Sequence, residues 1–251
     1  MKIVVIGGTG LIGSKLVKKL HEHGHEALAA SPDTGVDTIT GEGLAEVLDG
    51  ADVVVDVTNA PAWEDSAVMD FFLTSTRNTL RAEATAGVKH HVVLSVVGAD
   101  RLPDSGYFRA KVAQERAVEA STVPYTILRA TQFFEFIGRI ADSSMNGEGV
   151  HLPPVFIQPE SAADVASMLA ELAVNDPANG IVEIAGPEEF RLDELVKRLF
   201  SATNDPRRVA VDIEAPYFGA TLDYFSLTPG GHARIATTHF EDWLKRSAAM
   251  P

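Results

Sequence analysis

The sequence predicts an α/β fold built on a doubly wound parallel sheet with helices on both faces. In the first half of the chain, short runs rich in β-branched residues alternate with longer segments of helical periodicity. A glycine-rich segment, GGTGLIG, directly follows the first of these apolar runs. With 251 residues, 45% of them hydrophobic, the chain is long enough to bury a large core.

Five strands and four helices are expected in this first half. Helices are expected to begin near Leu11, Gly43, Ser66 and Tyr107, and the turn residue Gly24 is well placed to end the first of them. Parallel strands joined by such crossover helices give a sheet that is covered on both sides. The strands are the apolar runs at residues 2–6, 26–30, 52–57, 90–96 and 125–130.

After residue 129 the alternation ends, and a smaller α/β lobe is expected. The segment HLPPVFIQP carries three prolines in a short space. We expect residues 1–149 to form the main domain, and residues 150–251 to form a lobe that packs on it without being an independent domain. Within that lobe, periodicity predicts helices at 162–174, 192–202 and 240–246 and strands at 180–186 and 208–213.

The composition argues against several classes of partner. There are 21 Lys and Arg against 35 Asp and Glu, a net charge of -14, so the molecule as a whole repels a nucleic-acid backbone. No apolar run approaches the roughly 20 residues of a membrane span. Cysteine is absent, which fits a reducing compartment, and the histidines of HEHGH do not share a helix face. We expect a cytoplasmic monomer or homodimer with no metal site and no nucleic-acid or membrane partner.

The glycine segment is the most specific signal in the chain. Gly8, Gly10 and Gly13 form G-x-G-x-x-G between a buried strand and a helix, the context in which this pattern predicts dinucleotide binding. The early glycines allow a tight turn and a close approach of the pyrophosphate, and Gly13 allows the helix to pack closely on the strand. The residues expected to bind the dinucleotide here are Gly7, Gly8, Thr9, Gly10, Leu11, Ile12 and Gly13.

The end of the second strand normally separates NAD from NADP. An acidic residue there binds the ribose 2'-hydroxyl, whereas Arg accommodates a 2'-phosphate. The segment LAASPDTGVDT has neither at the strand end, but the hydroxyls of Ser31 and Thr34 could hold a phosphate, which favours NADP. Asp33 keeps NAD open, since it could bond the 2'-hydroxyl. Asp37 is also expected to bind the cofactor.

Taken together, the motifs resemble the short-chain dehydrogenase/reductase superfamily. They are the GGTGLIG loop, TNAP after the third strand, LSVVG on the next strand, and Tyr107-x-x-x-Lys111. PYTILRA is similar to a segment of the atypical, NmrA-like branch with quinone-reductase-type members, although Ala130 stands where that branch usually has proline. The resemblance covers the chain to about residue 165 and implies a Rossmann-like NAD(P)-binding fold.

Tyr107 and Lys111 are the expected centre of the chemistry. Residues at i and i+4 share a helix face, and a nearby ammonium lowers the pKa of a tyrosine, which suits it to act as a proton donor. The resemblance implies that Ser95 orients the substrate oxygen and that Lys111 also binds the nicotinamide-side ribose. It places the TNA segment, Thr58, Asn59 and Ala60, at the same end of the cofactor.

Aromatic residues near the expected cleft indicate a flat apolar substrate. Phe133, Phe134, Tyr217 and Phe218 are the candidates for the pocket, and Phe136 is expected in the core. The leading interpretation is an NAD(P)H-dependent oxidoreductase acting on an apolar or aromatic carbonyl or quinone. The alternative is a redox sensor that binds the dinucleotide without turnover. A nucleotide-sugar epimerase is disfavoured, since the distal part of the chain has few arginines for a second diphosphate.

Overall fold

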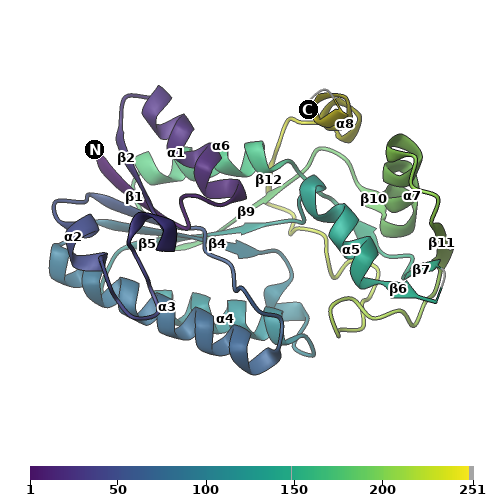
Figure 1. Ribbon diagram of the computed structural model, residues 1–251, viewed down its shortest axis with the longest axis horizontal. Helices are drawn as coiled ribbons and strands as arrows, with labels where there is room; N and C mark the ends of the chain where they lie inside the picture. The colour runs from purple at the N-terminus through teal and green to yellow at the C-terminus, as the bar shows by residue number, and fades with distance from the viewer. Residues whose placement is uncertain (148, 249–251) are drawn as a thin grey trace.

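The computed structural model describes residues 1–147 and 149–248 and confirms the α/β fold. Its centre is a seven-stranded parallel sheet in the order β12-β9-β5-β4-β3-β1-β2. In Figure 1, α1 and α6 cover one face of the sheet, and α3 and α4 cover the other. The strands are β1 (Lys2–Ile6), β2 (Glu26–Ala30), β3 (Val53–Asp56), β4 (His90–Val96), β5 (Tyr125–Ala130), β9 (Gly180–Ala185) and β12 (Arg234–Ile235). The helices of this lobe are α1 (Leu11–Glu22), α2 (Leu44–Leu48), α3 (Asp65–Ala86), α4 (Gly106–Glu119) and α6 (Ala162–Val174).

The apolar runs predicted as strands are buried on both faces, as a covered parallel sheet requires. On β1, Ile3 and Val5 pack with Leu16 of α1 in one hydrophobic cluster. Val4 and Ile6, which alternate with them, pack on the other face in a second cluster. Because the paired strands are parallel, their carboxyl ends lie at one edge of the sheet.

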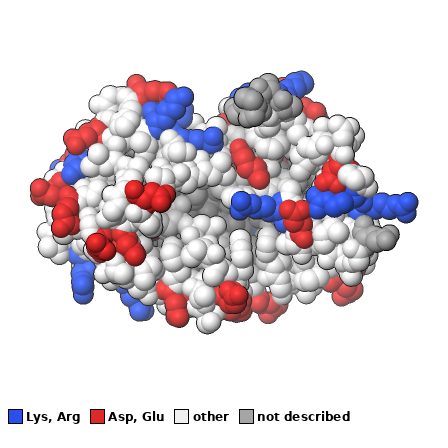
Figure 2. All heavy atoms as spheres, in the orientation of Figure 1, with Lys and Arg blue, Asp and Glu red and all other residues white. Residues whose placement is uncertain are grey.

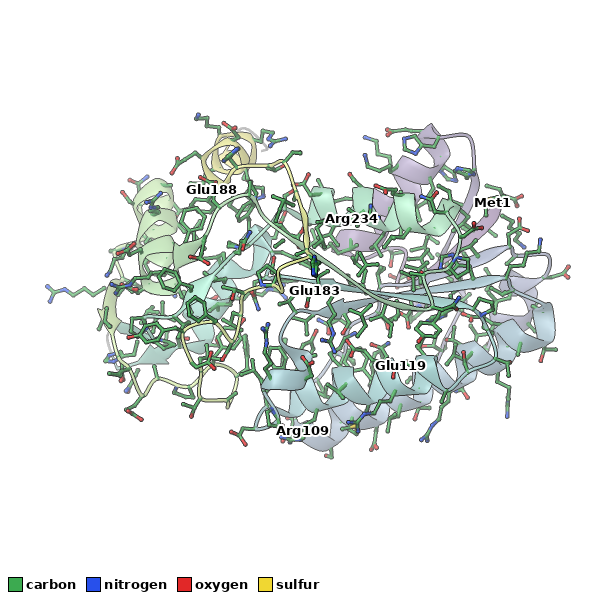
Figure 3. The ribbon with its side chains drawn as sticks, turned by 180° about the vertical axis from the view of Figure 1, so that it is seen from behind. Met1, Arg109, Glu119, Glu183, Glu188 and Arg234 are labelled. Carbon is green, nitrogen blue, oxygen red and sulfur yellow. The ribbon has the colours of Figure 1, made fainter. Side chains whose placement is uncertain are left out.

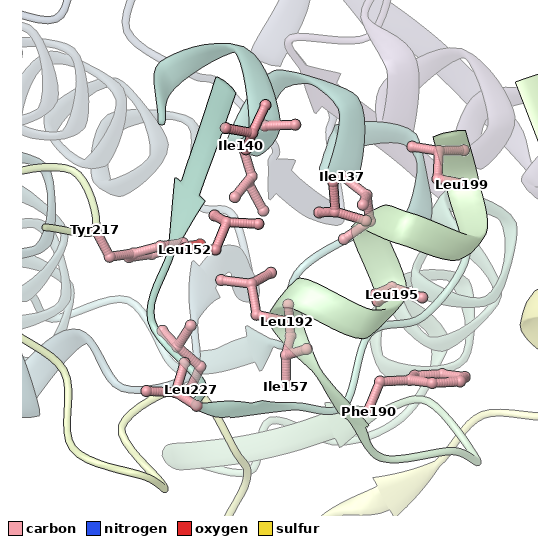
Figure 4. Packing of buried hydrophobic residues seen from close by; sticks show 14 of the residues in the cluster. Ile137, Ile140, Leu152, Ile157, Phe190, Leu192, Leu195, Leu199, Tyr217 and Leu227 are labelled. Carbon is pink, nitrogen blue, oxygen red and sulfur yellow. The ribbon is translucent and has the colours of Figure 1, made fainter. Parts of the chain in front are cut away.

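The smaller lobe has its own apolar core. Three short strands form one sheet in the order β11-β7-β6, and β10 pairs with β8 in another. Figure 4 shows Ile137, Ile140, Leu152 and Leu192 packed together inside this lobe. Its elements are α5 (Ile137–Ser143), β6 (Met145–Asn146), β7 (Gly149–Leu152), β8 (Phe156–Ile157), β10 (Phe190–Arg191), α7 (Leu192–Thr203), β11 (Arg208–Val211) and α8 (Phe240–Ala248).

The expected division into residues 1–149 and 150–251 needs correction. The chain returns to the large sheet after the first part of the small lobe, because β9 pairs with β5 and α6 packs beside α1. At the edge of this sheet, β12 pairs with β9, near the labelled Arg234 and Glu183 in Figure 3. Conversely, α5 precedes residue 150 but belongs to the small lobe.

None of the helices in the described part of the chain combines the length and the apolar character needed to cross a membrane.

Candidate functional site

The candidate site lies where the carboxyl ends of the central strands meet the smaller lobe. In an open parallel sheet, ligands bind in the crevice outside these strand ends. Figure 2 shows the surface hollowed between the two lobes. The loops after β1, β3, β4 and β5 all begin at this edge of the sheet.

The loop after β1 fits a dinucleotide pyrophosphate. A Cβ atom on Gly13 would lie 2.2 Å from the Gly7 carbonyl oxygen, and one on Gly8 would lie 2.5 Å from the Ala29 Cα atom, so both positions require glycine. Gly7 has φ +79°, a conformation that favours glycine. Gly10 caps α1 without a side chain, which leaves the first amides of that helix free for an anion.

The TNA segment lies beside this loop. A Cβ atom on Gly7 would lie 3.1 Å from the Thr58 backbone nitrogen. The Asp56 carboxylate accepts from the Thr58 backbone amide at 2.9 Å and from its hydroxyl at 2.7 Å. Asn59 Oδ1 accepts from the Ala60 amide at 3.0 Å. These bonds fix the shape of the TNA segment next to the glycine loop.

The segment after β2 is already bonded within itself. The Thr34 hydroxyl accepts from the Ser31 amide at 2.9 Å and lies 3.0 Å from the Ala29 carbonyl oxygen, to which it can donate. Ser31 Oγ accepts from the Thr9 amide at 3.3 Å, which ties this turn to the glycine loop. Ser31 therefore lies next to the dinucleotide loop, whereas the Thr34 hydroxyl closes the turn.

Asp37 also has a local role in the structure. Its Oδ1 accepts from the backbone amides of Ile39 at 2.7 Å and Thr40 at 3.3 Å. Asn78 of α3 donates to the carbonyl oxygens of Thr38 and Ile39 from the other side. The side chain of Asp37 thus shapes the turn between β2 and α2.

Tyr107 lies in the first turn of α4, half-buried among aromatic rings. Its ring centroid is 6.1 Å from that of Phe72 and 6.2 Å from that of Trp63. Burial raises the pKa of Tyr107 to about 12. The expectation that Lys111 lowers this pKa is therefore wrong for the protein alone, and the phenol is protonated at neutral pH.

Lys111 points into the interior, toward the sheet. Its Nζ atom donates to the Leu94 carbonyl oxygen at 2.8 Å and to Gln114 Oε1, and it lies 4.4 Å from the centroid of the Phe72 ring. Burial lowers the pKa of Lys111 to about 8, although Asp56 and Glu115 oppose the change. With an exposed fraction of 2%, Lys111 does not line the cleft as the ribose contact requires.

The Ser95 side chain also points into the interior, where it cannot take the expected role. Its hydroxyl donates to Glu115 Oε1 at 2.6 Å. Glu115 also accepts two bonds from Arg129, at 2.9 and 2.7 Å, and Arg129 donates to Asp100 at 3.1 Å. The hydroxyl proton of Ser95 is used inside this buried network, so Ser95 is not free to donate to a substrate oxygen.

The two phenylalanines after β5 separate into different environments. Phe134 is 1% exposed and packs 5.3 Å from Phe240 and 5.4 Å from Trp243, so its assignment to the substrate pocket is wrong and it belongs to the core. Phe133 is half-buried and stacks on Phe136 with ring centroids 5.6 Å apart. Phe136 is not fully buried either, contrary to its expected place in the core.

Tyr217 and Phe218 begin a tight turn that reaches across to the larger lobe. Tyr217 and Ala220 exchange backbone hydrogen bonds of 2.8 and 3.0 Å, and Phe218 has φ +45°. The Phe218 ring stacks on Trp63 at 6.0 Å, with 14° between the planes. Trp63 was missed, although a tryptophan two residues after TNAP was a usable signal.

Gln132 and Glu160 were also missed, and both lie near the carboxyl end of β5. The Glu160 backbone amide donates to the Gln132 carbonyl oxygen at 3.0 Å. Glu160 Oε1 accepts from Thr131, whereas Oε2 is buried without a partner among the described residues. Burial raises the pKa of Glu160 well above its usual range.

Replacing Glu160 with glutamine is therefore expected to stabilise the protein at high pH. A carboxyl group whose pKa is raised in the folded state loses stability as the pH rises above its unfolded value, and glutamine does not titrate. The advantage of Glu160→Gln should be small at pH 4 and grow by at most about 1.4 kcal/mol per pH unit. Urea unfolding between pH 4 and pH 8 measures it.

Glu135→Gln is the matched control for this change. Both Glu135 oxygens accept hydrogen bonds, from the Ala162 amide and from Trp243 Nε1, each at 3.1 Å. An amide retains one acceptor oxygen, so this variant should be less stable than the wild type at pH 8. A pH-independent difference between Glu160→Gln and the wild type would contradict the raised pKa of Glu160.

The curated relatives of this chain are distant. It is 29% identical over 257 residues to divinyl chlorophyllide a 8-vinyl-reductase of Oryza sativa, covering 84% of this chain and 61% of the relative. It is 24% identical over 217 residues to the photosystem II assembly factor Ycf39 of Synechocystis, covering 78% and 66%. An NAD(P)H azoreductase of Xenophilus azovorans is 28% identical over 235 residues, covering 84% and 78%. The chain thus spans less than two thirds of the length of the first two.

Solved structures match the fold over nearly the whole chain. MoeE5 in complex with UDP-glucuronic acid and NAD has a TM-score of 0.75 and 21% identity, with 98% of this chain and 97% of that chain covered. A UDP-glucose 4-epimerase of Thermus thermophilus in complex with NAD has a TM-score of 0.74 and 18% identity, with 98% and 97% covered. At these identities the likeness establishes the Rossmann-like fold alone.

A family model described as NAD(P)H-binding matches residues 7–176, more than half of the chain. The match starts in the glycine loop and includes the TNA segment and the helix that carries Tyr107 and Lys111. The match supports the resemblance to atypical short-chain dehydrogenases/reductases and identifies NAD(P) as the cofactor. The chain belongs to the NAD(P)H-binding family.

Proposed function

We propose that this protein is an NAD(P)H-dependent oxidoreductase that transfers a hydride to an apolar or aromatic carbonyl or quinone-like substrate, with Tyr107 as the proton donor. The observation that carries the proposal is a protonated phenol among aromatic rings that packs in one hydrophobic cluster with Ala60 of the TNA segment. When bound, the cofactor supplies the hydride. Tyr107 gives its proton to the substrate oxygen and regains one from solvent.

The names of two relatives support reduction of a conjugated acceptor. One is a vinyl-reductase of divinyl chlorophyllide a, and the other is an NAD(P)H azoreductase. The aromatic residues at the mouth of the site, Trp63 and Phe218, are suited to a flat apolar molecule. We assign cofactor binding to the larger lobe and substrate binding mainly to the smaller lobe, in a cytoplasmic monomer or homodimer.

We favour NADP over NAD. Ser31 lies beside the glycine loop with its own hydroxyl proton available, and a phosphate could accept it. Exposed Asp33 is the counterargument, since a carboxylate would repel the 2'-phosphate of NADP.

The first experiment is a titration of the purified protein with NADPH and with NADH, followed by fluorescence. Tight binding of either one supports the proposal, and the ratio of the two dissociation constants ranks the cofactors. Steady oxidation of the cofactor in the presence of 1,4-naphthoquinone or an aromatic aldehyde then tests for turnover. If neither dinucleotide binds, the proposal is wrong.

Lys111 contributes by positioning rather than by contact. Gln114, which accepts from Lys111, donates to Asp56 at 3.3 Å, and Asp56 holds Thr58 of the TNA segment. Lys111 also bonds to the Leu94 carbonyl oxygen on β4. The ammonium thereby fixes α4, and with it Tyr107, against the sheet and the cofactor loop.

Turnover is consequently expected to fall as the pH rises through about 8, where Lys111 loses its proton. Above this pH Lys111 loses the positive charge that interacts with Phe72, Asp56 and Glu115, and α4 is held less firmly. Lys111→Met should be less active at pH 7 and show no inflection near pH 8. A pH profile of kcat between pH 6 and pH 10 measures both effects, and Lys197→Met on the exposed side of α7 should retain the wild-type profile.

A redox sensor without turnover is the second candidate. It is favoured by the inward bonds of Ser95 and Lys111, which leave Tyr107 without the two helpers that the superfamily resemblance implies. One relative is named as an assembly factor rather than as a reductase. Tight NADPH binding combined with no oxidation across quinones and aldehydes would favour the sensor, and steady oxidation would eliminate it.

A further inference from the structure

Gln132 is a buried amide whose side-chain hydrogen bonding is incomplete among the described residues. It follows β5 by two residues, at the edge of the sheet where the candidate site lies, and it is 8% exposed. Neither Nε2 nor Oε1 makes a well-formed hydrogen bond among these residues, and the Tyr217 hydroxyl is the neighbour that comes within reach of the amide. Buried polar groups are nearly always bonded, so this incomplete bonding indicates a partner that a ligand supplies.

Two other glutamines, half-buried Gln158 and buried Gln114, show what a structural amide looks like in this protein. Gln158 donates to the Gly186 carbonyl oxygen at 2.8 Å. Gln114 accepts from Lys111 and donates to Asp56 and Thr76. Gln132 has no comparable role in holding the fold together.

The Tyr217 hydroxyl lies next to this amide. Burial raises the pKa of Tyr217, and the adjacent Gln132 opposes the increase. Tyr107 lies nearby, because its ring centroid is 5.8 Å from that of Phe108. The Tyr217 ring packs 6.4 Å from that of Phe108, and Figure 4 shows Tyr217 at the edge of the small-lobe core. Both phenols are neutral donors at neutral pH.

We infer that Gln132 and Tyr217 are positioning residues that hold a neutral substrate oxygen in front of Tyr107, in the role expected of Ser95. The inference deepens the proposed function and rests on it. The amide nitrogen and the Tyr217 hydroxyl donate to a carbonyl oxygen before reduction, and Gln132 Oε1 accepts from the hydroxyl that reduction produces. Such a set selects a neutral carbonyl or quinone oxygen.

The test combines stability with ligand binding, so it does not require turnover. Gln132→Met keeps the volume of the side chain and removes its polar atoms, and Gln158→Met is the matched control. Without ligand, Gln132→Met should raise Tm by about 3 °C, because a buried unsatisfied amide is removed, whereas Gln158→Met should lower Tm. The affinity for NADPH should stay within about twofold of the wild type in both Gln132→Met and Tyr217→Phe.

Binding of 1,4-naphthoquinone to the protein saturated with NADP+ is measured by calorimetry. Gln132→Met and Tyr217→Phe should each weaken it about tenfold, the effect of one lost hydrogen bond to a ligand. Tyr224→Phe is the control, since Tyr224 is 61% exposed and should bind the quinone as the wild type does.

Several outcomes would overturn the inference. They are a lower Tm in Gln132→Met, unchanged quinone binding in this variant, loss of its NADPH binding, and a wild-type protein that does not bind the quinone. The proposed reaction fails separately, if the quinone binds and no hydride is transferred. In that case weaker binding to Gln132→Met still supports the positioning role.

Discussion

Tyr107→Phe is expected to lower kcat at least a hundredfold, the low end for loss of a general acid, while NADPH affinity stays within about twofold. The substitution removes the proton donor and keeps the ring that packs on Phe72 and Trp63. Stopped-flow measurement of NADPH oxidation at saturating 1,4-naphthoquinone separates the chemical step from binding. A variant that keeps wild-type turnover would remove Tyr107 from the mechanism.

Tyr125→Phe is the matched control for this experiment. Tyr125 is a half-buried tyrosine that begins β5, at the opposite end of that strand from the site. It should retain wild-type kinetics. Because the pKa of Tyr107 is raised to about 12, ionisation of the phenol should not lower the rate below pH 10, so any inflection near pH 8 belongs to another group.

The parts of the fold that follow from local pattern were predictable. The strands β1, β3, β4 and β5 could be predicted from their β-branched runs, which are typical of strands buried on both faces. The glycine loop could be predicted from the strand and the helix on either side of it. Gly13 illustrates this, because the Gly7 carbonyl oxygen that would clash with a Cβ atom on Gly13 lies only six residues earlier in the chain. The position of the dinucleotide loop follows from the same local pattern.

The direction of each side chain at the site depended on residues far away in sequence. Ser95 pairs in register with Arg129 on β5, and Glu115 of α4 lies above both. A polar helix face was predictable from the sequence, because Lys111, Gln114 and Glu115 are spaced i, i+3 and i+4. The sequence did not show which of these side chains would bind to the sheet and which would line the cleft, because that depends on their partners on β4 and β5.

The lobe boundary was mispredicted for a related reason. Local pattern identifies β9 as a strand but does not say which strand it joins. It pairs with β5, so residues 180–185 extend the large sheet although they follow the first part of the small lobe. Phe134 was assigned to the pocket in the same way, because its burial depends on Phe240 and Trp243 near the other end of the chain.

Glu115→Gln is expected to reduce the free energy of unfolding by about 3 to 5 kcal/mol, the effect of breaking a buried ion pair. Glu115 and Arg129 have side chains 5% and 10% exposed, and the second partner of Arg129, Asp100, is largely exposed. The variant leaves the guanidinium buried without its main counter-charge. Urea unfolding of the wild type and the variant measures the difference.

The matched control changes a carboxylate to an amide at an exposed ion pair. Asp142 pairs with Arg207 at 2.6 Å and its side chain is 62% exposed, so Asp142→Asn should change stability by less than about 1 kcal/mol. The double variant Glu115→Gln with Arg129→Met removes both buried charges and should recover most of the loss. If the single and double variants are equally unstable, the damage comes from packing or from Ser95, and the buried charge of Arg129 is not its cause.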